Sequence, residues 1–330
     1  MPQAENAPIF WMGGRLATDL VAVTNDAADL DDGGFWAVST NFEGGFIAAK
    51  FATVIDSDFP AAAWTQLQGT WISNFSREQY CSYVESIRES IAQGWVYQVN
   101  ACRTISIENS SENLRGLFSE ILSKNPAPWA SYLEIPGLNI ASASPELFLK
   151  RVGSTVKTSP IKGTQQLNEK GFGNKDTAEN VMIVDLMRND FGQICESGTV
   201  EVPRLLANED HPGLRHLVSD VQGQIREELS WKEILESLSP PGSISGAPKS
   251  SAVSVIRENE AARGPYCGAL GWIHGKDAEL SVAIRIFWQE GKLHFGTGAG
   301  ITWNSDPQQE WEETQLKARN LISIAGGVLN

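Results

Sequence analysis

Apolar residues recur along the chain with two spacings, one typical of strands and one typical of helices. Residues 1–75 carry short alternating apolar runs between stretches rich in Gly, Ala and Asp, which indicates short strands and turns. Ser76 begins a helical pattern, because its hydroxyl can cap the first turn and Gln79 completes a capping box. Gly94 ends this helix, and residues 95–107 are expected to form a strand.

The same reasoning predicts the other elements. Helices are expected over residues 111–123, 177–189, 231–238, 248–259 and 306–325. Strands are expected over residues 129–135, 139–143, 146–150, 155–159, 280–288 and 292–297. The chain therefore mixes helices and strands, and two pairs of strands, 146–150 with 155–159 and 280–288 with 292–297, are expected to form hairpins.

One predicted hairpin brings two reactive side chains together. Strands 146–150 and 155–159 flank a turn at residues 152–154. Pairing across this turn places Glu146 near Lys162 at the open end of the hairpin. Lys162 lies in Ser-Pro-Ile-Lys-Gly-Thr, residues 159–164. A partly desolvated lysine beside an anion site can act as a nucleophile, whereas an isolated lysine of this kind is usually a surface residue near a turn.

Arg285 interrupts an apolar strand over residues 280–288. A hairpin across Glu290 and Gly291 would place it opposite Gly296, on the face that also carries two further glycines. A guanidinium fork beside bare backbone N–H groups is suited to a carboxylate. The alternative is a strand-edge arginine that reaches water.

Three glutamates are candidate metal ligands. Glu179 is expected in the first turn of an apolar helix, where it is either favoured by the helix dipole or a ligand. Glu310, Glu313 and Lys317 share one face of the last helix. Two carboxylates one turn apart disfavour each other unless a cation lies near them. The alternative is a solvated face with a Glu313–Lys317 pair.

Composition narrows the possible functions. The chain has 330 residues, 42% of them hydrophobic, and a net charge of −14, which argues against a nucleic-acid surface or attraction to anionic lipid. Its four cysteines show no CxxC spacing, and we expect reduced thiols in a cytoplasmic protein. We find no secretory signal and no stretch near the ~20 apolar residues of a membrane span.

Several segments together resemble a known family, the chorismate-utilising enzymes. These include anthranilate synthase component I, aminodeoxychorismate synthase component I, isochorismate synthase and salicylate synthase. The matching segments appear in family order: Tyr-Gln-Val-Asn at 97–100, Ser-Pro-Glu-Leu at 144–147, Pro-Ile-Lys-Gly-Thr at 160–164, residues 178–190, Arg-His-Leu-Val-Ser at 215–219, the glycine- and proline-rich loop 241–249, Gly-Ala-Gly-Ile at 298–301 and Glu-Trp-Glu-Glu-Thr at 310–314.

The resemblance implies a fold and an activity. The fold would be α/β, of the α+β type, with two large, mainly antiparallel sheets flanked by helices. A short strand-rich segment, residues 1–75, would pack on a catalytic unit formed by residues 76–330. Isochorismate and salicylate synthases have a lysine base where this chain has Gln98. Anthranilate synthases usually have alanine where it has Lys162, so the chain is most similar to aminodeoxychorismate synthase, which makes 4-amino-4-deoxychorismate for p-aminobenzoate and folate.

The resemblance also implies roles for individual residues. Lys162 would attack C2 of chorismate while Glu146 protonates the departing C4 hydroxyl, and ammonia would then add at C4. The cofactor would be Mg²⁺. The implied metal ligands are Glu179 and Glu313, with Glu310 acting through water; the implied substrate-binding residues are Arg285, His216, Gly298, Ala299, Gly300, Thr164, Gln98 and Lys317. For His216 the alternative is a hydrogen-bonded histidine in the core. For Lys317 we favour a supporting role, in which it pairs with a glutamate that binds the metal.

Ammonia requires a source, and no cysteine lies in a Gly-x-Cys-x-Gly nucleophile turn. The resemblance therefore implies a separate glutamine amidotransferase subunit, with free ammonia as a substitute in vitro. Family members usually have a longer N-terminal region, and Pro241 stands where glycine is common. Two alternatives stay open: anthranilate synthase, and a non-catalytic chorismate-binding subunit.

Overall fold

The computed structural model describes residues 7–109, 113–167, 171–211 and 214–329 of the chain. Its α-helices in this part are α1 (Arg77–Ala92), α2 (Arg115–Lys124), α3 (Asn174–Gly192), α4 (Trp231–Leu238), α5 (Lys249–Asn259) and α6 (Pro307–Ala325). Two short 3-10 helices are η1 (Ala27–Asp32) and η2 (Gly242–Ile244).

The strands form two sheets. In order of pairing, the first contains β12 (Glu201–His211), β13 (Leu214–Gln224), β11 (Ile161–Gln166) and β10 (Thr155–Ser159), both beside β13, then β9 (Leu147–Val152), β16 (Asp277–Val282), β15 (Ala269–His274), β3 (Phe35–Thr40) and β4 (Phe46–Asp56). The second contains β2 (Arg15–Thr24), β1 (Ile9–Met12), β7 (Trp129–Ile135), β8 (Leu138–Ser144), β17 (Ile286–Glu290), β18 (Lys292–Ile301), β6 (Gln98–Ile107), β5 (Leu67–Ser73) and β19 (Gly326–Leu329), with β14 (Gly246–Ala247) also beside β6.

The predicted α/β fold with two large, mainly antiparallel sheets is confirmed. Among the described pairings, β5–β19 is parallel and the others are antiparallel. The two sheets are joined by the pairing of β2 with β4, so a continuous ladder of hydrogen bonds bends from one sheet into the other. The strands of residues 1–75 pair with β7, β15 and β6, which places this segment inside both sheets.

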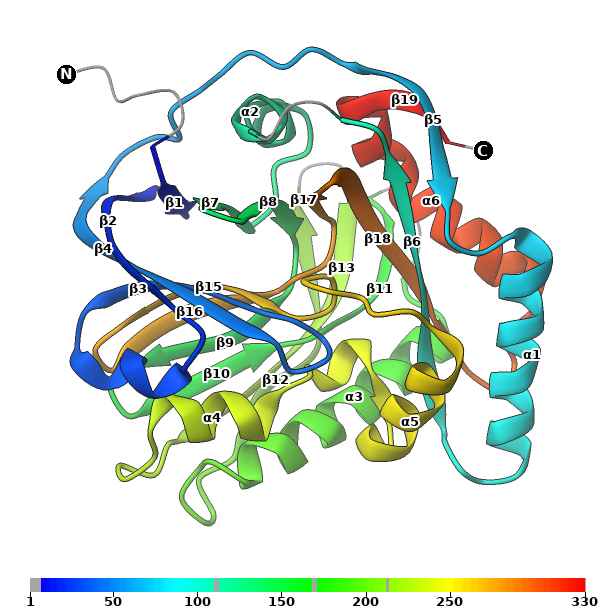
Figure 1. Ribbon diagram of the computed structural model, residues 1–330. Helices are drawn as coiled ribbons and strands as arrows, with labels where there is room; N and C mark the ends of the chain where they lie inside the picture. Colours follow the sequence, from blue (N-terminus) through cyan, green and yellow to red (C-terminus); the bar gives the residue numbers. More distant parts are fainter. Residues whose placement is uncertain (1–6, 110–112, 168–170, 212–213, 330) are drawn as a thin grey trace.

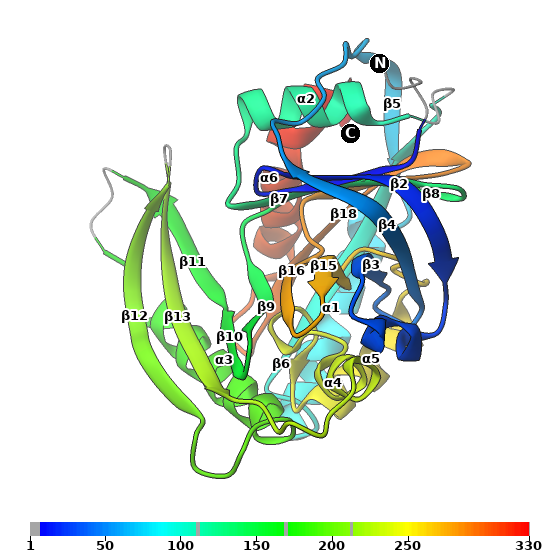
Figure 2. The same ribbon diagram turned by 90° about the vertical axis from the view of Figure 1, so that its left-hand side faces the viewer.

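Helices cover the sheets on two sides. Helices α3, α4 and α5 lie together at the bottom of the view in Figure 1, whereas α1 packs against α6 at its right. Figure 2 shows β11, β12 and β13 as a curved wall on the far side of the molecule from β2 and β4. The buried apolar residues form two clusters, a large one and a smaller one that includes side chains of α2, α6 and β5–β8. No helix in the described ranges is long and apolar enough to cross a membrane.

Several local predictions agree with the structure because they depend on neighbouring residues alone. Ser76 caps α1 through its side chain, and Gln79 completes the capping box. Helix α6 begins at Pro307, close to its predicted start, and Asp306 caps it by accepting hydrogen bonds from two backbone N–H groups of the first turn. The β9–β10 hairpin forms as expected. The predicted start of α2, at residue 111, falls outside the described residues; in the described part α2 begins at Arg115.

Two predictions were wrong. Residues 280–288 do not form one strand: β16 ends at Val282 and β17 begins at Ile286. Arg285 lies in this interruption with a left-handed φ of 53°, and it is not opposite Gly296. Helix α3 begins at Asn174, so Glu179 lies beyond the first turn, and Asp176 is the acidic residue of that turn.

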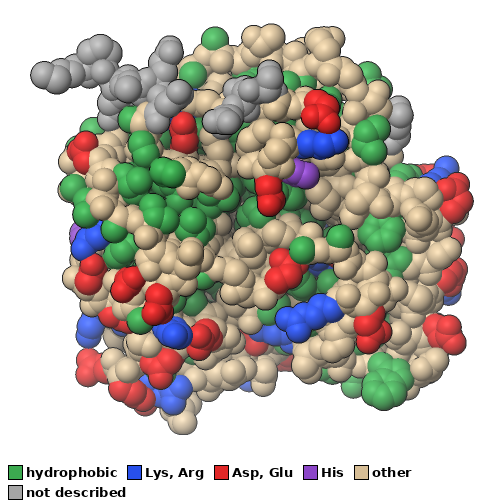
Figure 3. All heavy atoms as spheres, viewed as in Figure 1, with side chains coloured by type: hydrophobic (Ala, Val, Ile, Leu, Met, Phe, Trp, Pro, Cys, Tyr) green, Lys and Arg blue, Asp and Glu red, His purple; other side chains and the backbone are tan. Residues whose placement is uncertain are grey.

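Charged side chains are spread over the surface shown in Figure 3. On this face Lys and Arg lie among Asp and Glu rather than in one basic patch. On this face the acidic side chains lie between the basic ones, which agrees with the net charge of −14.

Candidate active site

Glu146 and Arg285 lie where the chain crosses between the two sheets. Glu146 stands between β8 of the second sheet and β9 of the first, and Arg285 stands between β16 of the first and β17 of the second. The crossings lie side by side: the N–H of Val282 donates to the carbonyl oxygen of Glu146, and the N–H of Ala143 donates to that of Arg285, both at 3.0 Å. The bend required at a crossing explains why the strand breaks at Arg285.

A β-bulge directs the side chain of Lys162. The register between β11 and β13 shifts between Ile161 and Thr164, and Gly163 has a φ of 85°. Bulges of this kind turn a side chain away from its regular position in the strand. The ammonium group of Lys162 donates a hydrogen bond to the carbonyl oxygen of Ser243 at 3.0 Å. Lys162 is therefore attached to the 3-10 turn η2, across the site from its own strand.

Four charged groups from three other parts of the fold act on Lys162. Burial lowers its pKa, and the negative charges of Glu146, Glu179 and Glu313 oppose this shift. The positive charge of Lys317 lowers the pKa of Lys162 further, and the net shift is downward. A sheet crossing, helix α3 and helix α6 thus bring their acidic residues to the same amine.

Glu146 has the opposite pKa shift. Its side chain is 5% exposed, and burial raises its pKa. The charge of Lys162, a hydrogen bond with the Ser243 side chain and the charge of Arg285 oppose the rise without cancelling it. Burial also lowers the pKa of Arg285, against the effect of Glu146. Burial therefore shifts the pKa values of Glu146 and Lys162 in the directions that favour their neutral forms, and the charges around them oppose both shifts in part.

Helix α6 supplies an ion pair at the edge of this site. The ammonium group of Lys317 lies 2.6 Å from the carboxylate of Glu313 and donates to the carbonyl oxygen of Gly298 at 3.0 Å. The pairing that we considered as an alternative is thus present, and it also ties α6 to β18. Glu310 is buried and accepts a hydrogen bond from the hydroxyl of Ser305 at 2.6 Å.

Two amide groups of β18 point away from β6. The N–H groups of Asn100 and Cys102 on β6 donate to acceptors outside β18, at 2.9 Å each. In an antiparallel ladder their partners Gly300 and Gly298 must then direct their own N–H and C=O groups away from β6. On this side β17 pairs with β18 only as far as Phe295 in the described ladder. The backbone of Gly298 and Gly300 can therefore serve a ligand at that edge.

The glycines are also required for packing between strands. A Cβ atom on Gly298 would lie 2.6 Å from Sγ of Cys102, and one on Gly300 would lie 2.4 Å from Nε2 of Gln98. Gln98 is 2% exposed, and its Oε1 has no hydrogen-bond partner among the described residues. Ala299 lies between the two glycines and is fully buried.

The donor set fits a magnesium ion only in part. No three His, Cys, Asp or Glu side chains form a ready cluster in the part of the chain that the structure describes. Glu179 and Glu313 nevertheless both act on the ammonium of Lys162, so their carboxylates face one region. Mg²⁺ often takes one or two protein carboxylates and completes its shell with water and substrate oxygens. Glu179 and Glu313 fit that pattern. Glu310 accepts from Ser305 through one carboxylate oxygen, and its expected role through water stays a prediction.

The remaining predicted residues lie on β13 and β11. His216 is 3% exposed and pairs in the ladder with Thr164 on one side and Glu209 on the other. The side chain of Thr164 is outside the described ones. For both residues a role toward the substrate stays a prediction.

Ser243 is a residue that the sequence reasoning did not single out. Its carbonyl oxygen accepts from Lys162, and its side chain hydrogen-bonds to Glu146. It lies in the glycine- and proline-rich loop 241–249, which the sequence analysis used only as one of the segments that resemble the family. A surface cavity of about 400 Å³ lies elsewhere, between α4 and the β3–β4 turn, and its lining includes Phe42, Lys232 and Arg257 but none of the predicted site residues.

Comparison with known protein families shows to which family the chain belongs. A family model described as chorismate binding enzyme matches residues 47–323. The chain belongs to this family. The match covers the two crossings at Glu146 and Arg285, the bulge at Lys162 and the acidic residues of α3 and α6.

Curated chorismate binding enzymes with two different names are similar to the chain. Anthranilate synthase component 1 1 of Haloarcula marismortui is 34% identical over 79% of this chain and 56% of its own length. Aminodeoxychorismate synthase component 1 of Klebsiella aerogenes is 32% identical over 83% and 64%, and that of Escherichia coli is 34% identical over 78% and 59%. The chain thus spans about half to two thirds of the length of the curated relatives it matches.

Solved structures of the family share the fold. Anthranilate synthase component I from Streptococcus pneumoniae superposes with a TM-score of 0.82 at 22% identity, covering 98% of this chain and 94% of that one. The menaquinone-specific isochorismate synthase from Escherichia coli gives 0.80 at 16% identity, covering 98% and 90%. At these identities the likeness establishes the architecture alone.

Proposed function

We propose that this chain aminates chorismate at C4 with ammonia, giving 4-amino-4-deoxychorismate. The observation that carries the proposal is the placement of Lys162 beside Glu146. Lys162 emerges from a bulge, donates to Ser243 and lies within electrostatic reach of the buried carboxyl group. The resemblance places a lysine here in aminodeoxychorismate synthases and usually an alanine in anthranilate synthases.

The first step is attack by the neutral amine of Lys162 on C2 of the ring. A bond forms between Nζ and C2, the ring double bond shifts, and the C4–O bond breaks. Glu146 donates its proton to the departing oxygen, which leaves as water. This step uses the protonation states that burial favours, a neutral amine and a protonated carboxyl group.

The second step releases the enzyme. Ammonia adds at C4, the double bond shifts back and the bond between Nζ and C2 breaks, so Lys162 is regenerated as an amine after proton transfer. Glu146, ionised by the first step, is placed to accept the proton that ammonia loses. The net change replaces the C4 hydroxyl by an amino group and releases water.

The carboxylates of the substrate require their own partners. Arg285 and the outward N–H groups of Gly298 and Gly300 would hold one carboxylate. Glu179 and Glu313 would hold Mg²⁺, which supplies charge neutralisation for the other carboxylate. Lys317, paired with Glu313, would fix that ligand against β18.

The ammonia would come from a separate glutamine amidotransferase subunit. All four cysteines of the chain are buried, and none lies in a nucleophile turn. Free ammonium should replace the partner in vitro. We propose folate precursor synthesis in the cytoplasm as the setting.

The second candidate function is the conversion of chorismate to anthranilate. It is favoured by relatives with that name, including one from Acetivibrio thermocellus that is 36% identical over 76% of this chain. This reaction also requires elimination of pyruvate.

A product assay with chorismate, Mg²⁺ and ammonium separates the candidates. We expect a product that yields p-aminobenzoate only after a lyase for aminodeoxychorismate is added. Anthranilate fluorescence without any added lyase would overturn the first proposal in favour of the second. Chorismate binding without any product would leave a non-catalytic subunit.

A further inference from the structure

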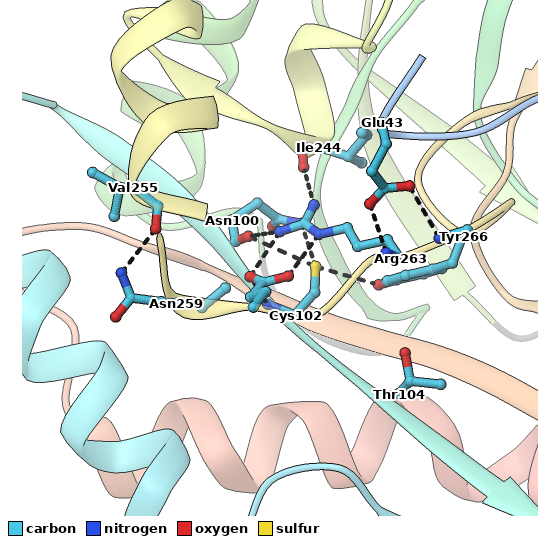
Figure 4. A network of polar contacts seen from close by, with 12 residues as sticks. Glu43, Asn100, Cys102, Thr104, Ile244, Val255, Asn259, Arg263 and Tyr266 are labelled. Atoms are coloured by element: carbon cyan, nitrogen blue, oxygen red, sulfur yellow. Dashed lines mark hydrogen bonds and ion pairs between the residues drawn. The ribbon is translucent and has the colours of Figure 1, made fainter. Parts of the chain in front are cut away.

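A buried ion pair contacts two backbone segments of the candidate active site. The side chains of Arg263 and Glu260 are 2% and 3% exposed. Nε and Nη2 of Arg263 donate to the two carboxylate oxygens of Glu260 at 2.7 and 2.8 Å. This bidentate geometry is the strong form of such a pair. Figure 4 shows the guanidinium at the centre of a network of polar contacts.

The same guanidinium binds two backbone segments of the site. Nη1 donates to the carbonyl oxygen of Ile244 at 3.2 Å, and Nη2 donates to that of Asn100 at 2.7 Å (Figure 4). Ile244 directly follows Ser243, the acceptor of Lys162. One planar group therefore joins the η2 turn, which receives the lysine, to strand β6.

Glu260 extends this connection along β6. One of its carboxylate oxygens also accepts from the N–H of Cys102 and from the hydroxyl of Tyr83, each at 2.9 Å. Cys102 is the ladder partner of Gly298. By engaging this N–H, Glu260 keeps it turned away from β18, which is the arrangement that leaves the amide of Gly298 free of β6.

The backbone and the ring face of Arg263 are fixed as well. Its guanidinium carbon lies 4.2 Å from the ring centroid of Phe42. The carboxylate of Glu43 accepts from the N–H groups of Arg263 and Gly264 at 2.6 and 3.2 Å. With its backbone, its ring partner and its donors all engaged, the guanidinium cannot shift without moving η2 or β6.

Stability alone does not explain such a pair. A buried ion pair loses much of its Coulomb energy to desolvation, and apolar replacements are often neutral or stabilising. The donors used here go to two carbonyl oxygens in separate segments, a geometry that only a planar fork can satisfy. Geometric control of the site is therefore the more specific role.

We propose that Arg263, held by Glu260, is a positioning residue that sets the η2 turn, and with it Lys162, against the β6–β18 edge where the substrate binds. The inference rests on the proposed function and adds a residue that does not touch the substrate. Strand β18 is held to β6 by a nine-residue ladder, whereas the segment after η2 is held to β6 by the two residue pairs of β14 and by the N–H of Asn100, which donates to the carbonyl oxygen of Ser245 at 2.9 Å. Disturbing Arg263 should therefore displace the lysine acceptor more than the carboxylate site.

The test compares Arg263→Lys with Arg115→Lys. Arg115 is a matched control, because it is also buried and lies 2.6 Å from the carboxylate of Glu134, on α2 and β7 away from the site residues. Both variants are assayed with chorismate, Mg²⁺ and ammonium below their measured unfolding temperatures. We expect kcat of Arg263→Lys to fall on the order of tenfold or more, with KM for chorismate changed less than about twofold. Arg115→Lys should keep the wild-type kcat.

A second readout needs no substrate. The rate at which acetic anhydride modifies Lys162 is measured by peptide mass spectrometry at one fixed pH. Arg263→Lys should change this rate by about threefold or more, because the lysine loses its fixed acceptor, and Arg115→Lys should not. If wild-type protein forms no aminated product, the proposed function fails, while the labelling rates still decide the role of Arg263.

Equal labelling rates in wild type and Arg263→Lys would overturn the inference, as would a fall in kcat that matches the control. Should Arg263→Lys not fold, Glu260→Gln takes its place, since the amide keeps one acceptor oxygen but removes the bidentate pair. The same kcat and labelling changes are then expected, and their absence would have the same meaning.

Discussion

The ammonium group of Lys162 donates a hydrogen bond to the carbonyl oxygen of Ser243 at 3.0 Å, across the site from its own strand. A carbonyl acceptor holds the amine in place without requiring it to stay charged, since a neutral amine can still donate an N–H. An ion pair as the sole anchor would instead favour the protonated, non-nucleophilic form. The contact therefore suits a lysine that must be both fixed and reactive.

Replacing Lys162 with alanine should abolish amination. We expect formation of aminodeoxychorismate from ammonium to fall by at least about 100-fold, because the variant lacks the amine that we propose as the nucleophile. Binding of chorismate should persist, since Arg285 and the amides of β18 are unchanged. Product chromatography and calorimetric titration measure the two quantities. Undiminished turnover in the variant would remove the covalent role.

The rate should depend on pH in a bell-shaped manner. Turnover requires Lys162 neutral, so kcat should fall as pH drops through the lowered pKa of this amine. It also requires Glu146 protonated, so kcat should fall again as pH rises through the raised pKa of this carboxyl group. Because the two groups interact, the observed limbs belong to the pair.

The variant Glu146→Gln tests the assignment of the alkaline limb. An amide of the same shape cannot give up a proton to the departing oxygen, so kcat should fall by about 10²- to 10⁴-fold. The alkaline limb should also disappear from the pH profile of the remaining activity. A variant with an unaltered alkaline limb would assign that limb to another group.

The parts of the site that the sequence predicted well depend on local pairing. A two-residue turn fixes the β9–β10 hairpin, and from it follows the approach of Glu146 to Lys162. The capping box of α1 and the start of α6 are equally local. The spacing of Glu313 and Lys317 on one helix face gave their ion pair directly.

The parts that it missed depend on contacts between distant segments. Residues 280–288 are apolar apart from Ser281 and Arg285, and nothing in that run shows that the chain passes there from one sheet to the other. The joining of the sheets through β2 and β4 is likewise a tertiary feature. The carbonyl oxygen of Ser243 accepts from Lys162, and the guanidinium of Arg263 donates to the carbonyl oxygen of Ile244. Contacts to backbone carbonyl oxygens cannot be predicted from the pattern of side chains in the sequence.

The dependence of activity on Mg²⁺ should change when either of two predicted glutamates is replaced. Glu179→Gln and Glu313→Gln should each raise the Mg²⁺ concentration needed for half-maximal activity by at least about tenfold, a change known even for residues that only support a ligand. Glu312→Gln is the matched control, because this neighbour on α6 pairs with Arg77 in a largely exposed position. Activity is measured against Mg²⁺ concentration after removal of metal with a chelator. If all three variants follow the wild-type curve, the magnesium assignment is wrong.

The bulge at Lys162 should be sensitive to a single methyl group. Gly163 has a φ of 85°, and a Cβ atom there would lie 2.8 Å from the ring of Phe172. Gly153→Ala is the control, because this hairpin glycine has a φ of 58° but no heavy atom within 4 Å of the added carbon. The left-handed conformation alone costs about 1–2 kcal/mol, so urea unfolding should show about that loss for Gly153→Ala and a larger one for Gly163→Ala. Only Gly163→Ala should also lower kcat, since relieving the clash with Phe172 must move the backbone that directs Lys162. Equal losses of stability with unchanged kcat in both variants would show that the bulge does not control the position of the lysine.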